Sequence, residues 1–199
     1  MIAFALPNER TKPPRVPETE RAILLRCKGG DAMAFRAFVV RYERAVFALL
    51  SRMLGRGPHV EDLAQETFLR AHRAFGAFDV DAVARPSTWL LTIATRLALD
   101  WSKRRMPRVA PIDDAAEVAA TSTPESDRAR AELGRAIARA AQQLPADQRA
   151  AFVLAELHDF TNADIAVALG VPEATVKTRL FRAREKMRVQ LEEWKRGGR

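Results

Sequence analysis

The 199-residue sequence contains few of the side chains that form disulfides or bind metals: it has one cysteine and three histidines. A single cysteine, Cys27, excludes an internal disulfide and fits a reducing compartment. His59, His72 and His158 are far apart in the sequence and form no metal-ligand spacing with Cys27 or with a nearby carboxylate. We therefore expect no metal and no cofactor.

Long apolar runs are also missing. No run of about 18 apolar residues is present, so we expect no segment that spans a bilayer. The opening MIAFAL is too short for the core of a signal peptide and lacks a basic leader. These features predict a cytoplasmic protein. Runs that alternate apolar and polar residues between hairpin turns are almost absent, so the fold class that we expect is all-α.

Positive charge is abundant. The 33 lysines and arginines exceed the 25 acidic residues, which gives a formal net charge of +8. This balance indicates a polyanionic partner, either nucleic acid or an anionic membrane surface. The length allows one large or two small domains, and a hydrophobic content of 48% is enough for real cores.

Apolar spacing predicts helices in two blocks, separated by a different kind of segment. In the first block the expected helices are 18–27, 31–54 with Asp31 as its cap, 60–75 and 88–106. In the second block they are 126–143 and 145–157, followed by two short helices. Residues 107–127 between the blocks contain three prolines, and five acidic residues against one arginine.

Two small helical domains joined by a flexible linker are therefore the expected architecture. The first consists of a helical bundle, and the second ends in a helix-turn-helix. We place a disordered arm at 1–16, the first domain at 17–106, the flexible acidic and proline-containing linker at 107–124, and the second domain at 125–199.

The segment from Thr161 to Arg188 is typical of a helix-turn-helix. Gly170 can adopt the left-handed conformation of a sharp turn, and Pro172 suits the start of the helix that follows. In that second helix an apolar seam (Val176, Leu180, Ala183, Met187, Leu191) is opposed by six cations (Lys177, Arg179, Arg182, Arg184, Lys186, Arg188). Such a helix can enter the DNA major groove. An arginine-rich amphipathic helix can equally be a solvated face.

A second basic cluster ends the first block, and it consists of Arg96, Lys103, Arg104, Arg105 and Arg108. Two cationic surfaces on two tethered domains suggest one extended ligand that is contacted at two places. The tether would raise the effective concentration for the second contact.

Three stretches together resemble the sigma-70 family of bacterial transcription initiation factors, specifically its extracytoplasmic-function (ECF) group. They are DLAQETFLRAHRAF (62–75), STWLLTIATRLALDWSKRR (87–105) and the segment from Leu144 to Arg188. The sequence departs from the family pattern at Pro86, at Thr95-Arg96 and at Asp164, where an aromatic residue, Arg-Asn and Glu are usual. The resemblance implies a subunit without catalysis of its own, which binds core RNA polymerase and directs promoter recognition and opening.

The first stretch resembles the family's polymerase-binding helix. The residues that we expect to bind core polymerase are Asp62, Gln65, Glu66 and Arg73. Their mixed carboxylate, amide and guanidinium groups suit docking on another helical surface, which the resemblance identifies as the β′ coiled coil. The alternatives are a solvated face, or a metal site made by Glu61, Asp62 and Glu66. The resemblance also implies contact with the β flap and an anti-sigma factor.

The second stretch resembles the helix beside the promoter-melting loop. We hypothesise that the loop 76–87 and this helix capture an unpaired base of the minus-ten element and bind strand phosphates. The residues assigned to this role are Phe78, Asp79, Arg85, Arg96, Lys103, Arg104 and Arg105. Trp89 and Trp101 are either stacking platforms or core residues, and the phase of Trp101 with Ile93 and Leu97 favours the core.

The third stretch resembles the domain that recognises the minus-thirty-five element. The residues assigned to DNA there are Thr161, Glu173, Thr175, Lys177, Thr178, Arg179, Arg182 and Arg184. With the apolar seam buried, base readout falls to Glu173, Thr175, Thr178 and Arg182, and phosphate contact to Lys177, Arg179 and Arg184. Thr161 either touches phosphate or only caps its helix.

Two other function classes remain alternatives at this point. A transcription regulator could use the same helix-turn-helix on duplex DNA without polymerase. An enzyme is disfavoured, because the sequence has no phosphate-binding Gly-x-x-x-x-Gly-Lys-Ser/Thr loop, no His-Glu-x-x-His pattern and no evident nucleophile and base.

Overall fold

The computed structural model describes residues 17–80, 85–104 and 124–197 of the chain. Within these ranges it contains eight α-helices, one short 3₁₀ helix and no strand, so the all-α prediction is confirmed. The arm at 1–16 lies outside the described residues, as do Arg105 and the whole of the expected linker except its last residue, Pro124.

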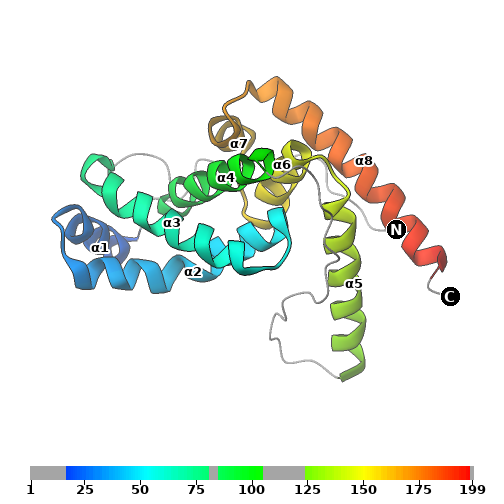
Figure 1. Ribbon diagram of the computed structural model, residues 1–199, viewed down its shortest axis with the longest axis horizontal. Helices are drawn as coiled ribbons and strands as arrows, with labels where there is room; N and C mark the ends of the chain where they lie inside the picture. Colours follow the sequence, from blue (N-terminus) through cyan, green and yellow to red (C-terminus); the bar gives the residue numbers. More distant parts are fainter. Residues whose placement is uncertain (1–16, 81–84, 105–123, 198–199) are drawn as a thin grey trace.

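The N-terminal lobe contains α1 (Glu18–Lys28), α2 (Ala32–Leu54), α3 (Pro58–Ala74), the 3₁₀ helix η1 (Phe75–Ala77) and α4 (Pro86–Arg104). The long helix α2 packs against α1, α3 and α4 (Figure 1). An aromatic cluster lies in the core of this lobe. The ring centre of Trp89 lies 5.2 Å from that of Phe75 and 4.6 Å from that of Phe78. The ring centres of Phe38 and Phe75 are 5.1 Å apart.

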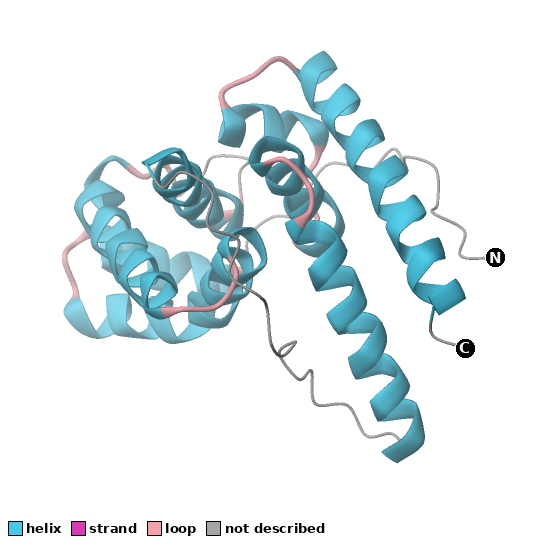
Figure 2. Cartoon of the chain, turned by 45° about the vertical axis from the view of Figure 1, so that its right-hand side comes forward, coloured by secondary structure: helices cyan, strands magenta, loops and turns pink. Residues whose placement is uncertain are grey.

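The C-terminal lobe contains α5 (Pro124–Gln142), α6 (Ala146–Leu157), α7 (Asn162–Leu169) and α8 (Glu173–Gly197). Helix α8 packs against α5, α6 and α7, and both ribbon views show α5 beside it (Figures 1 and 2). Helix α5 begins at Pro124 and not near Ser126. The end of the expected linker is therefore helical, because proline suits the first turn, where no backbone N–H is needed.

Local capping chemistry sets several helix ends. The Asp31 carboxylate accepts hydrogen bonds from the backbone N–H groups of Met33 and Ala34 and so begins α2 as expected. Thr161 and Asp164 form a reciprocal capping box at the start of α7. Gly170 ends α7 with φ of 64°, the left-handed conformation that the turn requires.

The two lobes pack directly on each other. Helix α4 contacts α6 and α7, and α2 contacts α5 and α6. One cluster of buried apolar side chains continues from Phe38 and Leu90 in the N-terminal lobe to Leu154, Ile165 and Val176 in the C-terminal lobe. The sequence patterns contain no signal for this packing, because every spacing that they use is local.

Candidate nucleic-acid interface

The surface of α8 opposite its apolar seam is accessible. The seam residues Val176, Leu180, Ala183 and Met187 are all buried, which confirms the predicted phase of the helix. The opposite side exposes Glu173, Ala174, Lys177, Thr178, Phe181 and Arg182, whereas Thr175 is half-buried. We call these six exposed residues the α8 face. The Thr178 hydroxyl donates to the Ala174 carbonyl oxygen at 3.0 Å.

The cations of α8 differ in how they are held. Arg179 pairs with Asp147 at 3.0 Å, and Arg184 pairs with Glu156 at 2.7 Å. Both carboxylates belong to α6, so these two arginines lie on the flank of α8 that faces the rest of the lobe. Among the described residues, Arg182 forms no ion pair, so its guanidinium is available to an outside ligand.

Arg188 lies further along α8 and is paired within the helix. Its guanidinium contacts the carboxylates of Glu185 and Glu192, and these contacts raise the pKa of Arg188 and lower the pKa of Glu185. Because both partners are one turn away on the same exposed surface, this network lowers the net positive charge of the helix beyond the α8 face.

The Thr161 side chain caps the start of α7. Its hydroxyl accepts a hydrogen bond from the Asp164 backbone N–H at 3.1 Å and donates to the Asp164 carboxylate at 2.8 Å. The Asp164 carboxylate in turn accepts from the Thr161 backbone N–H at 3.0 Å. Capping therefore accounts for this threonine, and its side chain has little capacity left for a phosphate.

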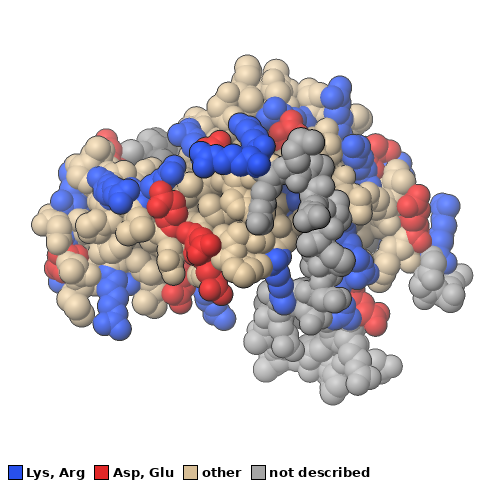
Figure 3. Space-filling view, viewed as in Figure 1, with Lys and Arg blue, Asp and Glu red and all other residues tan. Residues whose placement is uncertain are grey.

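The described residues of the basic cluster on α4 differ in their contacts: Arg96 bonds to the other lobe, whereas Lys103 and Arg104 do not. Arg96 donates to the carbonyl oxygens of Val167 at 2.8 Å and Ala168 at 3.3 Å, both at the end of α7. Lys103 and Arg104 are exposed, and Lys103 lies 3.9 Å from the Asp100 carboxylate. Lysine and arginine side chains are visible over α4 and along α8 in the space-filling view (Figure 3).

Phe78 requires a correction. It was assigned to capture an unpaired base, but its side chain is 7% exposed and packs on Phe75 and Trp89. Its ring packs at the edge of the aromatic core, where the loop begins. The ring is buried there because removing its apolar surface from water is favourable. Asp79 next to it is exposed and Arg85 is half-buried, so these two polar residues remain at the surface of the loop.

The two tryptophans of the N-terminal lobe pack differently. Trp89 packs in the aromatic core, as the sequence favoured, whereas Trp101 is half-buried and stacks on the His59 imidazole with 4.3 Å between the ring centres. Thr95, at one of the positions that depart from the family pattern, is fully buried, and its hydroxyl donates to the Leu91 carbonyl oxygen. Thr95 therefore faces the core in this arrangement.

Helix α3 carries a mixed polar surface with an apolar centre. Asp62, Gln65 and Arg73 are exposed, and Glu66 is half-buried and pairs with Arg70 at 2.7 Å. Leu69 lies among them and is 52% exposed. The sequence reasoning missed Leu69, although the spacing 62, 66, 69 and 73 places it on the same helical face. We call these five residues (Asp62, Gln65, Glu66, Leu69, Arg73) the α3 face. Acidic side chains group over α3 (Figure 3).

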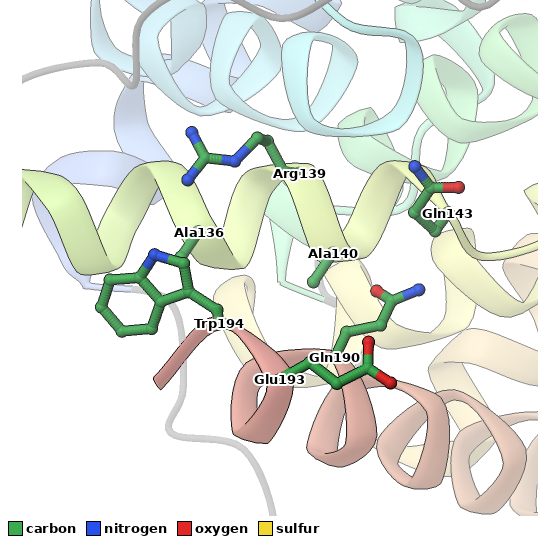
Figure 4. Close-up of a pocket in the computed structure, with 7 residues that line it drawn as sticks. All are labelled: Ala136, Arg139, Ala140, Gln143, Gln190, Glu193 and Trp194. Atoms are coloured by element: carbon green, nitrogen blue, oxygen red, sulfur yellow. The ribbon is translucent and has the colours of Figure 1, made fainter. Parts of the chain in front are cut away.

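Other kinds of site find little support. In the residues that the structure describes, no group of three or more His, Cys, Asp or Glu side chains could hold a metal ion. No described helix is long and apolar enough to cross a membrane. An open groove between α5 and α8 is lined by two alanines, by Trp194 and by the polar side chains of Arg139, Gln143, Gln190 and Glu193 (Figure 4). The Arg139 side chain points away from Gln190 and Glu193, so the polar groups do not converge on one point, as a ligand site requires.

Comparison with known proteins identifies both lobes. Residues 38–108 match the family model of sigma-70 region 2, and residues 134–187 match that of sigma-70 region 4. The ECF RNA polymerase sigma-E factor of Escherichia coli (strain K12) is 33% identical over 177 residues, covering 84% of this chain and 91% of the relative. The RNA polymerase sigma-H factor of Pseudomonas aeruginosa is 33% identical over 178 residues with the same coverage.

Solved structures agree with the fold. The structure of CnrH in complex with the cytosolic domain of CnrY has a TM-score of 0.63 and 25% identity, covering 88% of this chain and 99% of that one. The sigma factor RpoE of Bartonella quintana, solved with the anti-sigma factor NepR, has a TM-score of 0.62 and 22% identity, covering 79% and 96%. The second likeness supports the fold alone.

Fold and surface together define an all-helical, two-lobed helix-turn-helix protein with an exposed basic recognition helix. The chain belongs to the sigma-70 family, in its ECF group, as the sequence motifs predicted. It is therefore a sigma factor of RNA polymerase that recognises promoters in transcription initiation.

Proposed function

We propose that the α8 face reads the minus-thirty-five element of the promoter and that the cluster on α4 binds the minus-ten region. The observation that carries this proposal is the exposed α8 face on a helix-turn-helix whose seam is buried. Arg182 can donate two hydrogen bonds to guanine, and the exposed ring of Phe181 offers apolar contact to a thymine methyl group. Lys177 is exposed beside them and suits a phosphate contact.

The cluster on α4 contributes charge to the minus-ten region. Lys103 and Arg104 present exposed cations at the end of the helix, where strand phosphates can approach. Asp79 and Arg85, near the opposite end of α4, supply polar groups for an unpaired base. Phe78 is left out of this assignment because its ring is buried.

The α3 face is the proposed docking surface for core RNA polymerase. Leu69 provides the apolar centre, and the carboxylates, amide and guanidinium around it provide oriented polar contacts. By family likeness the partner surface is the β′ coiled coil, and the C-terminal lobe would meet the β flap. The same likeness supports an anti-sigma factor as a further partner and the cytoplasm as the site of action. We assign the chain no catalytic activity of its own.

Core binding and transcription test this function. Leu69→Asp places a charge in the apolar centre of the α3 face, and we expect at least a tenfold loss of affinity for core polymerase. The matched control is Leu25→Asp, because Leu25 is 44% exposed on α1 and lies outside that face. Affinity is measured by titrating labelled protein with core enzyme.

Transcription in vitro then separates a sigma factor from a free regulator. With core polymerase, the wild-type chain should start transcripts that core enzyme alone does not start, and Leu69→Asp should reduce them in step with its binding defect. Equal losses for both leucine variants would contradict the docking surface. Specific binding to duplex DNA without any effect on core polymerase would favour a regulator that acts alone.

A further inference from the structure

Helix α6 carries a carboxylate near each of its ends, and both carboxylates contact arginines of α8. Asp147 lies in the first turn of α6, and its Oδ2 atom is 3.0 Å from Nε of Arg179. Glu156 lies in the last turn, and its Oε1 atom accepts hydrogen bonds from Nε and Nη2 of Arg184 at 3.0 and 2.7 Å. Because α6 packs along α8 (Figure 1), these contacts tie both guanidinium groups to the body of the lobe.

The two ion pairs are partly shielded from water. The side chain of Arg179 is 23% exposed and that of Arg184 is 36% exposed. Asp147 is held a second time, because its Oδ1 atom accepts a hydrogen bond from the Gln148 backbone N–H at 2.9 Å. Salt screens a partly buried pair less than a fully exposed one. Both pairs should therefore persist at the ionic strength at which the protein meets DNA.

Other cations of α8 are left available. Lys177 and Arg182 are exposed, and in the part of the chain that the structure describes neither pairs with a carboxylate. Contacts between cations and phosphates give affinity for every DNA sequence alike, whereas base contacts give discrimination. Each further arginine that reaches a phosphate would therefore add affinity without selectivity.

We propose that Asp147 and Glu156 are specificity-determining residues, which keep Arg179 and Arg184 from the phosphates of non-promoter DNA. The inference rests on the proposed function of the α8 face. Base contacts fix α8 in the groove of a promoter, so the two arginines stay against α6. A complex with random DNA has no such contacts and can shift until a released guanidinium meets a phosphate. The carboxylates therefore weaken non-specific binding more than promoter binding.

Solvent exchange of the Arg184 Nε proton tests one ion pair without DNA or polymerase. The nuclear magnetic resonance signal is assigned by its loss in Arg184→Ala. We expect Glu156→Gln to accelerate the exchange at least threefold, because an amide oxygen holds a guanidinium more weakly than a carboxylate does. Unchanged exchange would overturn the proposal.

The matched control is Glu193→Gln, the same substitution at an exposed position of α8. Within the described ranges Glu193 forms no ion pair, so its neutralisation should leave the Arg184 exchange rate unchanged. Circular dichroism checks that each variant keeps wild-type helicity. Asp147→Asn provides a second, independent variant for the measurements with DNA.

Affinity of the whole chain for a random-sequence duplex, measured over a series of salt concentrations, tests the effect on DNA. Glu156→Gln and Asp147→Asn should each raise this affinity about twofold to fivefold, the range for release from one partly exposed pair. Each should also steepen the dependence of log affinity on log salt by about 0.9, the value for one added phosphate contact. Equal gains in Glu193→Gln, or gains without a steeper slope, would overturn the proposal.

A double-mutant cycle separates release of the arginine from simple loss of a negative charge. In an Arg184→Ala background there is no guanidinium to release, so Glu156→Gln should no longer change the affinity for random DNA. If the gain persisted in that background, reduced repulsion of phosphate would be its cause and the proposal would be wrong.

Promoter selection with core polymerase present links the ion pairs to function. Glu156→Gln should lower the ratio of promoter affinity to random-duplex affinity at least twofold, and Glu193→Gln should leave that ratio unchanged. If the wild-type chain selects promoters and Glu156→Gln keeps the full ratio, the inference fails and the proposed function stands. If the exchange rates report the ion pair but the wild-type chain selects no promoter, the proposed function itself fails.

Discussion

The basic surfaces of the two lobes are made in different ways. The α8 face is set up by residues close together in the sequence: a capping box at Thr161 and Asp164, a left-handed glycine and one helical period. The basic cluster on α4 depends on a partner 71 residues away, because Arg96 is held by the Val167 carbonyl oxygen. The first surface can act as soon as its lobe folds, whereas the second also depends on how the lobes are arranged.

The largest expected effect tests whether the lobes form one cooperative unit. Phe38 is buried in the shared core, and Phe38→Ala should lower the free energy of unfolding by about 3–5 kcal/mol. Hydrogen exchange should then accelerate at buried amides of α6 and α7 as well as in the N-terminal lobe. Phe47→Ala is the control, since Phe47 is 39% exposed and should cost about 1 kcal/mol.

If hydrogen exchange in Phe38→Ala accelerated only in the N-terminal lobe, the prediction would be contradicted. The lobes would then unfold independently despite their common apolar cluster.

A smaller effect should follow from pH. Burial, and then the charge of Arg52, lower the pKa of His158 to about 4, while Asp159 opposes them. Its Nε2 atom is buried, with no hydrogen-bond partner in the described part of the chain. Because the pKa is lower in the folded state, the stability from neutral His158 is present above pH 6.5 and is lost as the pH falls toward 4. The expected loss between pH 7 and pH 4.5 is about 2 kcal/mol.

Urea titrations at several pH values measure this loss, and His158→Leu should flatten the dependence. The control is His72→Leu, because His72 is exposed on α3. If His158→Leu retained the full pH dependence, another group would be responsible.

The smallest effect concerns the local construction of the DNA-reading motif. Thr161→Ala removes the capping box of α7 and should destabilise the C-terminal lobe by about 1 kcal/mol. Thr178→Ala removes only an exposed hydroxyl bonded within its own helix, and we expect less than about 0.5 kcal/mol. Thermal melting of both variants measures the difference, and equal costs would argue against the cap.

Sequence patterns predicted the elements whose causes are local. The all-α class, the Asp31 cap, the turn at Gly170 and the buried seam of α8 all follow from spacing and capping preferences. Helix starts were less well predicted: α3 and α4 each begin two residues before the expected position, at a proline. Proline marks a first turn more reliably than the first apolar residue does.

What the sequence could not predict depends on contacts between distant residues. Arg149 and the Met53 carbonyl oxygen are 96 residues apart, and no periodic pattern joins them. Phe78 lies in a segment that the sequence identifies as a loop. Only its contacts with the rings of Phe75 and Trp89 show that it packs in the core. Arg179 and Arg184 were assigned to phosphate contacts, and no local pattern indicates that carboxylates on α6 pair with them.

The most direct test of the central claim is to map transcription starts on a promoter library, using core polymerase with the wild-type chain and with Arg182→Ala. The account predicts that the wild-type chain selects promoters with a shared upstream element. Arg182→Ala should relax selection at one guanine of that element, at a cost of about 1–3 kcal/mol in discrimination. An unchanged promoter set with Arg182→Ala, or a set with no shared upstream element, would contradict it.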